Sequence, residues 1–147
     1  MFGYVDAMAG RRGIDASTAA TDTDSQSGID ILLGLASRSI AEQRLVAPQG
    51  SNAYEFYLSV LQLEPNNPTA QDKLRQLLPT ATAEVERTIN QDELSEAQRE
   101  LSLLREFDST NYTLSLLGGK LDAHRQLLTR RHEAQAALIQ AARAGTQ

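Results

Sequence analysis

The chain has 147 residues, of which 41% are hydrophobic and 5% aromatic, with no cysteine and a formal net charge of −5. The absence of cysteine excludes disulfide bonds, cysteine metal sites and thiol catalysis, and the acidic charge argues against a nucleic-acid partner, which usually requires a basic face. With so few aromatic residues, the core is expected to consist mainly of leucine and alanine, as in packed helices.

The N-terminal segment is predicted to be disordered. Residues 1–27 hold mainly Gly, Ala, Ser, Thr and Asp without a helical spacing of apolar residues. Such a segment buries too little surface to offset the entropy lost on ordering it. We therefore predict a disordered leader over 1–27, a helical domain over 28–143 and a frayed tail over 144–147.

Two helices are predicted at the start of the domain. Apolar residues recur at helical spacing over 29–40, and this helix is expected to end near Arg44. A second helix follows, with Ser51 or Asn52 as its N-cap. It is expected to end before Pro65, because a residue that precedes proline disfavours the helical conformation.

The next helical segment is predicted to begin at Thr69 and contains a proline. Pro79 lacks an amide donor and its ring clashes with the preceding turn of a helix. We therefore expect a kink or a restart there, so that the segment is either one long bent helix or two helices.

Two more helices are predicted toward the C-terminus. Asp92 is the expected N-cap of a helix over 93–107. The last helix is predicted to start near Tyr112 and to run past residue 142. Gly118 and Gly119 should weaken it by roughly 1 kcal/mol each relative to alanine.

An internal repeat relates two of these helices. A shift of 44 residues aligns residues 53–67 with 97–111, and each segment opens with alanine and ends in an acidic turn that bears asparagine. The small first residue lets two helices approach closely, while a bulky residue one turn later fills the space beside it. The positions predicted to build the repeat are Ala53, Tyr57, Val60, Pro65, Ala97, Leu101 and Leu104.

The first copy resembles the second helix of a tetratricopeptide repeat. In that family a small residue, an aromatic residue, an aliphatic residue and a proline follow at fixed spacing, and Ala53, Tyr57, Val60 and Pro65 occupy these places. The second copy departs from the pattern, since it lacks the aromatic residue and the proline. The resemblance implies an all-α, antiparallel helix–turn–helix (TPR-like) solenoid of about two units plus a long C-terminal capping helix.

Such a fold implies a non-catalytic protein–protein interaction module. The first helices of the units, here 29–43, 68–90 and 112–130, line the concave side of a solenoid, where a protein or peptide partner binds. Candidate partner-binding residues are Arg38, Arg87 and Lys120, as clamps for carboxylates, and Tyr54, as an anchor. The alternative is that the three cations are solvated and that Tyr54 packs against a neighbouring helix.

A narrower resemblance concerns four segments: residues 44–57, 77–79, 111–117 and 120–125. They are similar to the helical repeat-like segment of some proteobacterial TonB-family energy transducers. That resemblance implies a bacterial periplasmic adaptor, part of a parent protein anchored in the inner membrane; a cytoplasmic location is the alternative. The chain itself is not expected to insert into a membrane, because no apolar run approaches the roughly 20 residues that a spanning helix needs.

A second hypothesis is a self-associating structural domain without a peptide-binding groove. In that hypothesis a homo-oligomer forms through the C-terminal helix, which buries Leu127, Leu128, Ala137, Leu138 and Ala141 against a second copy. Light scattering separates the two hypotheses. Nearby basic residues such as Arg130 and Arg131 are predicted to form a solvated helical face.

No catalytic residue, cofactor or metal site is predicted. His124 and His132 lie eight residues apart on one helix, roughly 12 Å along its axis, which is too far for one metal ion, so both are predicted to be solvated. An acidic cluster is predicted to lie near helix starts and on polar faces, where no catalytic pair of carboxylates arises. Its members are Glu84, Glu86, Asp92, Glu93, Glu96 and Glu100.

Overall fold

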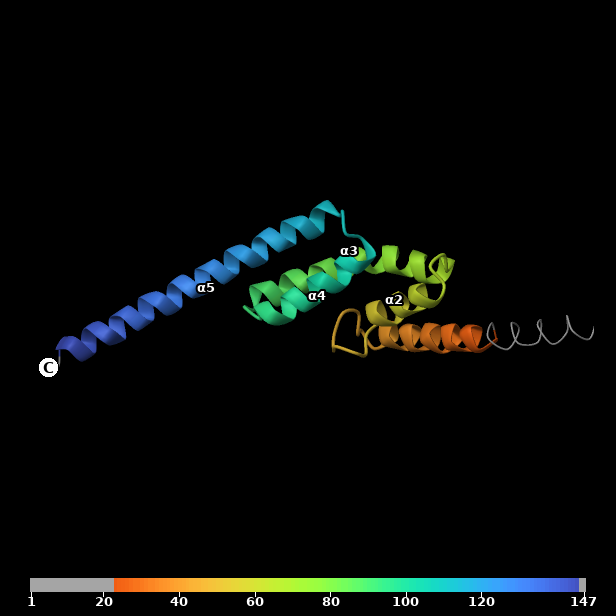
Figure 1. Ribbon diagram of the computed structural model, residues 1–147, viewed down its shortest axis with the longest axis horizontal. Coiled ribbons are helices and arrows are strands. Elements are labelled where there is room, and N and C mark those ends of the chain that lie inside the picture. Colours follow the sequence, from red (N-terminus) through yellow and green to blue (C-terminus); the bar gives the residue numbers. More distant parts are fainter. Residues whose placement is uncertain (1–22, 146–147) are drawn as a thin grey trace, which may run out of the picture.

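The computed structural model describes residues 23–145, and this part of the chain is helical throughout apart from short turns and one loop (Figure 1). Residues 23–41 form the first helix, drawn in orange. It is followed by α2 (Ala53–Leu63), α3 (Pro68–Asn90), α4 (Leu94–Phe107) and α5 (Tyr112–Gly145). The predicted all-α fold is confirmed.

The helical part extends beyond both predicted domain boundaries. Residues 23–27 are helical although the leader was predicted to reach residue 27, and the Gln26 side chain donates a hydrogen bond to Asp30 one turn later (3.1 Å). At the other end, residues 144 and 145 still belong to α5, where fraying was predicted. The remainder of the predicted leader, 1–22, and the last two residues lie outside the described residues.

Asparagine side chains cap the helices that follow the two repeat-related turns. Asn67 accepts a hydrogen bond from the amide three residues later (2.9 Å) and donates one to the Glu64 carboxylate (3.4 Å). Forty-four residues further on, Asn111 accepts the equivalent bond (3.1 Å) and donates to Asp108 (3.1 Å). The repeat therefore extends to the hydrogen bonds of the turns, which satisfy the free amides at each helix start. Asn52, one of the two predicted caps, does the same for α2 (2.9 Å).

α3 is one continuous helix through Pro79, so a break into two helices is excluded. Pro68 occupies the first position of the helix, where a missing amide donor costs nothing. Pro79 is exposed, whereas the turns on either side bury Leu74 and Ala81. Their packing offsets the roughly 3 kcal/mol that a proline costs inside a helix.

The predicted cap of α4 is wrong. Asp92 has a φ of 59°, the left-handed conformation of a turn, and Glu93 is the residue that precedes the helix. The Asp92 carboxylate instead lies 3.3 Å from the His124 imidazole on α5. α5 is continuous through Gly118 and Gly119 despite their low helix propensity.

The helices pack as stacked hairpins. α3 contacts α2, α4 and α5, and α2 also contacts α4. The first helix runs antiparallel to α2, because a Cβ placed on Gly28 at its start would lie 3.7 Å from Leu63 at the end of α2. Helices thus touch both the next helix and the next but one along the chain.

The repeat positions form the centre of the core. Ala53, Val60, Ala97, Leu101 and Leu104 are fully buried, and Tyr57 is 1% exposed. Pro65 lies exposed in the turn just after α2, where it prevents the helix from continuing. Six of the seven repeat positions therefore belong to the core, and Pro65 lies at the surface.

Because Ala53 and Ala97 are fully buried, a larger side chain at either position should overpack the core. We expect Ala53→Leu and Ala97→Leu each to lower the free energy of unfolding by about 1–3 kcal/mol. Urea unfolding followed by circular dichroism measures this, with Ala83→Leu on the exposed side of α3 as the matched control. Unchanged midpoints for both buried variants would contradict the assigned packing.

α5 is much longer than the surface it packs against. It has 34 residues, but its buried residues are Leu114, Leu117 and Leu121, all in its first three turns. Residues 129–145 are exposed without exception, and Figure 1 shows this part, in blue, extending beyond the other helices. Within the described part of the chain, no helix is long and apolar enough to span a membrane.

Candidate functional site

A groove of about 500 Å³ lies between the C-terminal end of the first helix and α3. We call it the α3 groove. Its lining residues are Ile40, Gln43, Leu45, Leu77, Thr80, Glu84 and Arg87. Leu45 is buried and the other two aliphatic side chains are half-buried, so the groove combines apolar contacts with two charged groups.

The two charged groups of the α3 groove lie one helical turn apart on α3. Burial raises the pKa of the Glu84 carboxyl, and the nearby Arg87 guanidinium lowers it by a smaller amount. Arg87 itself is exposed. When Glu84 takes up a proton, the groove therefore becomes more positive, which favours an anionic group of a partner.

Of the predicted cationic clamps, only Arg87 lines the α3 groove. Arg38 is exposed on the first helix. Lys120 forms an ion pair with Glu86 across the contact between α5 and α3 (3.0 Å). The three side chains are therefore distributed over three helices and are not combined in one groove.

Tyr54 is not a surface anchor, and this prediction is wrong. Its side chain is fully buried, and its hydroxyl donates a hydrogen bond to the Leu74 carbonyl on α3 (2.6 Å). Burial, with a smaller contribution from the Asp108 charge, raises the pKa of the phenol. Tyr54 precedes Tyr57 by three residues and therefore shares its buried face.

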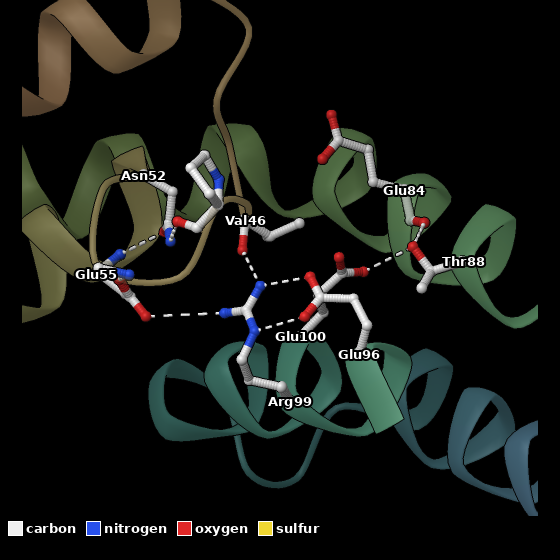
Figure 2. Close-up of polar contacts among 10 residues, drawn as sticks. Val46, Asn52, Glu55, Glu84, Thr88, Glu96, Arg99 and Glu100 are labelled. Atoms are coloured by element: carbon white, nitrogen blue, oxygen red, sulfur yellow. Dashed lines mark hydrogen bonds and ion pairs between the residues drawn. The ribbon is translucent and has the colours of Figure 1, made fainter. Parts of the chain in front are cut away.

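A cluster of polar side chains connects α4 with α2 and the loop before it (Figure 2). Two nitrogens of Arg99 donate hydrogen bonds to the Glu96 carboxylate (2.7 and 2.6 Å). Nη2 also donates to the Val46 carbonyl (2.8 Å), and Nη1 lies 3.7 Å from Glu55. Glu55 and Arg99 occupy equivalent positions of the repeat, so stacking of the two copies brings opposite charges together. Only Arg99, which is long and carries several donors, reaches all three groups.

Glu100 extends the cluster to α3. Its side chain is 3% exposed, and Thr88 on α3 donates a hydrogen bond to it (2.9 Å; Figure 2). Burial raises the pKa of Glu100 to about 7, and a hydrogen bond with the Glu96 carboxyl adds to this shift. The hydrogen bonds from Arg99 lower the pKa of Glu96. The prediction that these carboxylates lie on polar faces is therefore wrong for Glu100.

Two carboxyl groups with different pKa values are one feature of acid–base catalysts. Here, however, the partners of Glu100 are Thr88 and Glu96. A hollow of about 160 Å³ beside Arg99 is lined by five residues, and Glu100 is not one of them. The contacts of the pair suit a role in joining α3 and α4 better than contact with a substrate.

The histidines lie in different surroundings. His124 is half-buried against Asp92, so the prediction that it is solvated is wrong, whereas His132 is exposed. The turn after α3 places Asp92 beside His124 on α5, and sequence analysis did not predict this contact between two segments far apart in the chain. Among residues 23–145, no group of three or more His, Asp or Glu side chains lies close enough to hold a metal ion.

No known protein family, no curated protein and no solved structure matches this chain. The tetratricopeptide-like and TonB-like resemblances therefore stay predictions from sequence segments. What the helices establish is an all-α fold with a groove on the side of the first helix and α3.

Proposed function

We propose that this protein is a non-catalytic interaction module that binds a peptide segment of a partner protein in the α3 groove. The observation that supports this most is the combination of a volume of about 500 Å³ with aliphatic lining residues and a cation at the edge. Binding sites commonly have this size and this mixture of apolar surface and a few polar groups.

The lining of the groove indicates the chemistry of the peptide. Ile40, Leu45 and Leu77 favour an aliphatic or aromatic side chain. Arg87 favours an aspartate, a glutamate or a terminal carboxylate beside it, because guanidinium binds carboxylates through paired hydrogen bonds. The lining comes from the first helix, the loop after it and α3, and the TPR-like interpretation predicts that both of these helices contribute to a binding side.

A peptide selection tests the proposal. A library of random dodecapeptides displayed on phage is selected on the full chain, and the affinity of enriched peptides is measured by fluorescence anisotropy. We expect peptides with an apolar residue next to an acidic one, and a loss of about tenfold or more in affinity for Arg87→Glu. Arg75→Glu, an exposed residue on the same helix, is the matched control and should bind as the unaltered chain does.

Two outcomes would count against the α3 groove. One is enrichment of peptides whose binding is equally weakened by Arg75→Glu, which indicates a nonspecific charge effect. The other is the absence of any enriched peptide under conditions in which the protein remains folded by circular dichroism.

A narrower form of the proposal is that the module acts in the bacterial periplasm as part of a TonB-like energy transducer. Its support is the similarity of the four segments named above, which here comprise the loop into α2, the middle of α3 and the start of α5. Cell fractionation with an antibody against the chain tests it, since recovery in the cytoplasm would contradict a periplasmic site.

The second candidate function is a self-associating structural domain, and one observation favours it. Beyond the first three turns of α5, Leu127, Leu138 and Ile139 are 44%, 72% and 49% exposed. Residues 129–145 are all exposed in the described chain, whereas most of the stability of protein helices comes from tertiary packing. A partner surface that covers this part of α5 would therefore stabilise it.

A further inference from the structure

A second groove is lined mainly by residues of α2 and α4, together with Leu32 of the first helix. It has a volume of about 440 Å³, and its lining includes Leu32, Glu55, Phe56, Leu58, Leu103 and Glu106. The hollow beside Arg99 shares three of these residues and so continues the groove along α4. We call it the acidic groove, because both of the charged side chains in its larger part are carboxylates.

The two carboxylates of the acidic groove differ in their contacts. Glu55 accepts a hydrogen bond from the Gly50 amide and lies 3.7 Å from Arg99. Glu106 is exposed and has no hydrogen bond or ion pair with another residue of the described chain. The groove thus offers apolar surface beside a carboxylate that no cation among residues 23–145 neutralises.

The distal half of α5, by which we mean residues 127–145, has the complementary properties. At 100° per residue, Leu127, Ala134, Leu138 and Ala141 share one narrow face of the helix. Arg130 and Arg131 border that face, on opposite sides. Residues 129–145 are all exposed, so no other part of the described chain covers this face.

Acidic side chains predominate in residues 23–111, and basic side chains predominate in α5. Residues 23–111 carry fourteen acidic and seven basic side chains, whereas α5 carries two acidic and five basic ones. Electrostatic attraction therefore favours a contact between α5 and residues 23–111 of a second copy. It disfavours a contact between two α5 helices, in which arginines would face arginines.

We propose that the distal half of α5 docks into the acidic groove of a second copy of this chain, with Leu138 against the apolar lining and Arg131 beside Glu106. The same molecule does not offer this contact, because α5 is one unbroken helix whose C-terminal part extends away from α2 (Figure 1). The contact joins two different surfaces, so it either closes reciprocally into a dimer or extends into a larger assembly. It uses α2 and α4 and is independent of peptide binding in the α3 groove.

Light scattering coupled to size-exclusion chromatography, over a concentration series of the full chain, tests the docking. We expect the mass to rise with concentration, and Glu106→Arg and Arg131→Glu each to weaken association at least tenfold. A mixture of the two variants should associate again, because the unaltered α5 of the Glu106→Arg variant can dock into the unaltered groove of the Arg131→Glu variant. Asp30→Arg, an exposed charge reversal on the first helix, is the matched control.

Each alternative result overturns the proposal. A chain that stays monomeric at the highest concentration excludes docking to a second copy. Association that Arg131→Glu weakens and Glu106→Arg leaves unchanged places α5 against a surface other than the acidic groove. Circular dichroism melting curves confirm that the variants fold, and peptide binding in the α3 groove is measured separately on the same proteins.

Discussion

Replacement of Arg99 by methionine is expected to lower the free energy of unfolding by about 2–4 kcal/mol. The guanidinium contacts Glu96, the Val46 carbonyl and Glu55, and the Arg99 side chain is only 19% exposed. Methionine preserves most of the apolar stem, but it leaves the Glu96 carboxylate and the Val46 carbonyl without their donor and removes the cation near Glu55. The loss of partners at partly buried acceptors, rather than the loss of one ion pair, sets the size of the effect.

Urea unfolding at pH 7 measures this loss. Arg75→Met is the matched control, because Arg75 pairs with Asp72 on the surface of α3, where both side chains are more than 60% exposed. Exposed ion pairs of this kind contribute about 1 kcal/mol or less. An Arg99→Met variant as stable as the Arg75→Met variant would show that the cluster does not hold α2 and the preceding loop to α4.

Replacement of Glu100 by glutamine is expected to stabilise the protein by about 1–3 kcal/mol at pH 8 and to have little effect near pH 4. In the folded chain Glu100 keeps its proton up to about pH 7, whereas its ordinary pKa is 4.5. The folded state therefore binds more protons between these two values, and the free energy of unfolding falls as the pH rises through this window. Glutamine does not ionise, so the free energy of unfolding of the variant does not fall through this titration as the pH rises.

The amide also fits the contacts of the protonated carboxyl. Its oxygen accepts the hydrogen bond from Thr88, and its NH₂ group donates to Glu96 in place of the shared proton. Thermal or urea unfolding at several pH values between 4 and 8 gives the comparison, with Glu133→Gln on the exposed part of α5 as the control. A difference from the unaltered chain that is the same at pH 4 and pH 8 would contradict burial of an ionisable Glu100.

Features that depend on neighbours along the chain were predictable from the sequence. The helical spacing of apolar residues predicted the helices. The 44-residue repeat predicted positions of α2 and α4 that are buried, such as Ala53 and Ala97. The asparagine of each repeat turn proved to be the cap of the next helix. These are effects within one or two turns, where propensity and capping dominate.

Features that depend on packing between helices were not predictable. Tyr54 lies on the face of α2 that meets α3, and Glu100 is buried because Thr88 of α3 lies opposite. α3 passes Pro79 without a break because tertiary packing outweighs a local penalty. Of the predicted binding residues only Arg87 lines the α3 groove, since helix membership does not fix the direction of a side chain.

The most direct test of peptide binding in the α3 groove is NMR chemical-shift mapping of the ¹⁵N-labelled chain, titrated with a peptide enriched in the selection. We expect the largest changes at the amides of Ile40, Leu45, Leu77 and Arg87, which come from separate parts of the sequence and meet only in the groove. Changes confined to α5, or to the acidic groove on α2 and α4, with the amides of the α3 groove unmoved, would contradict the proposed function.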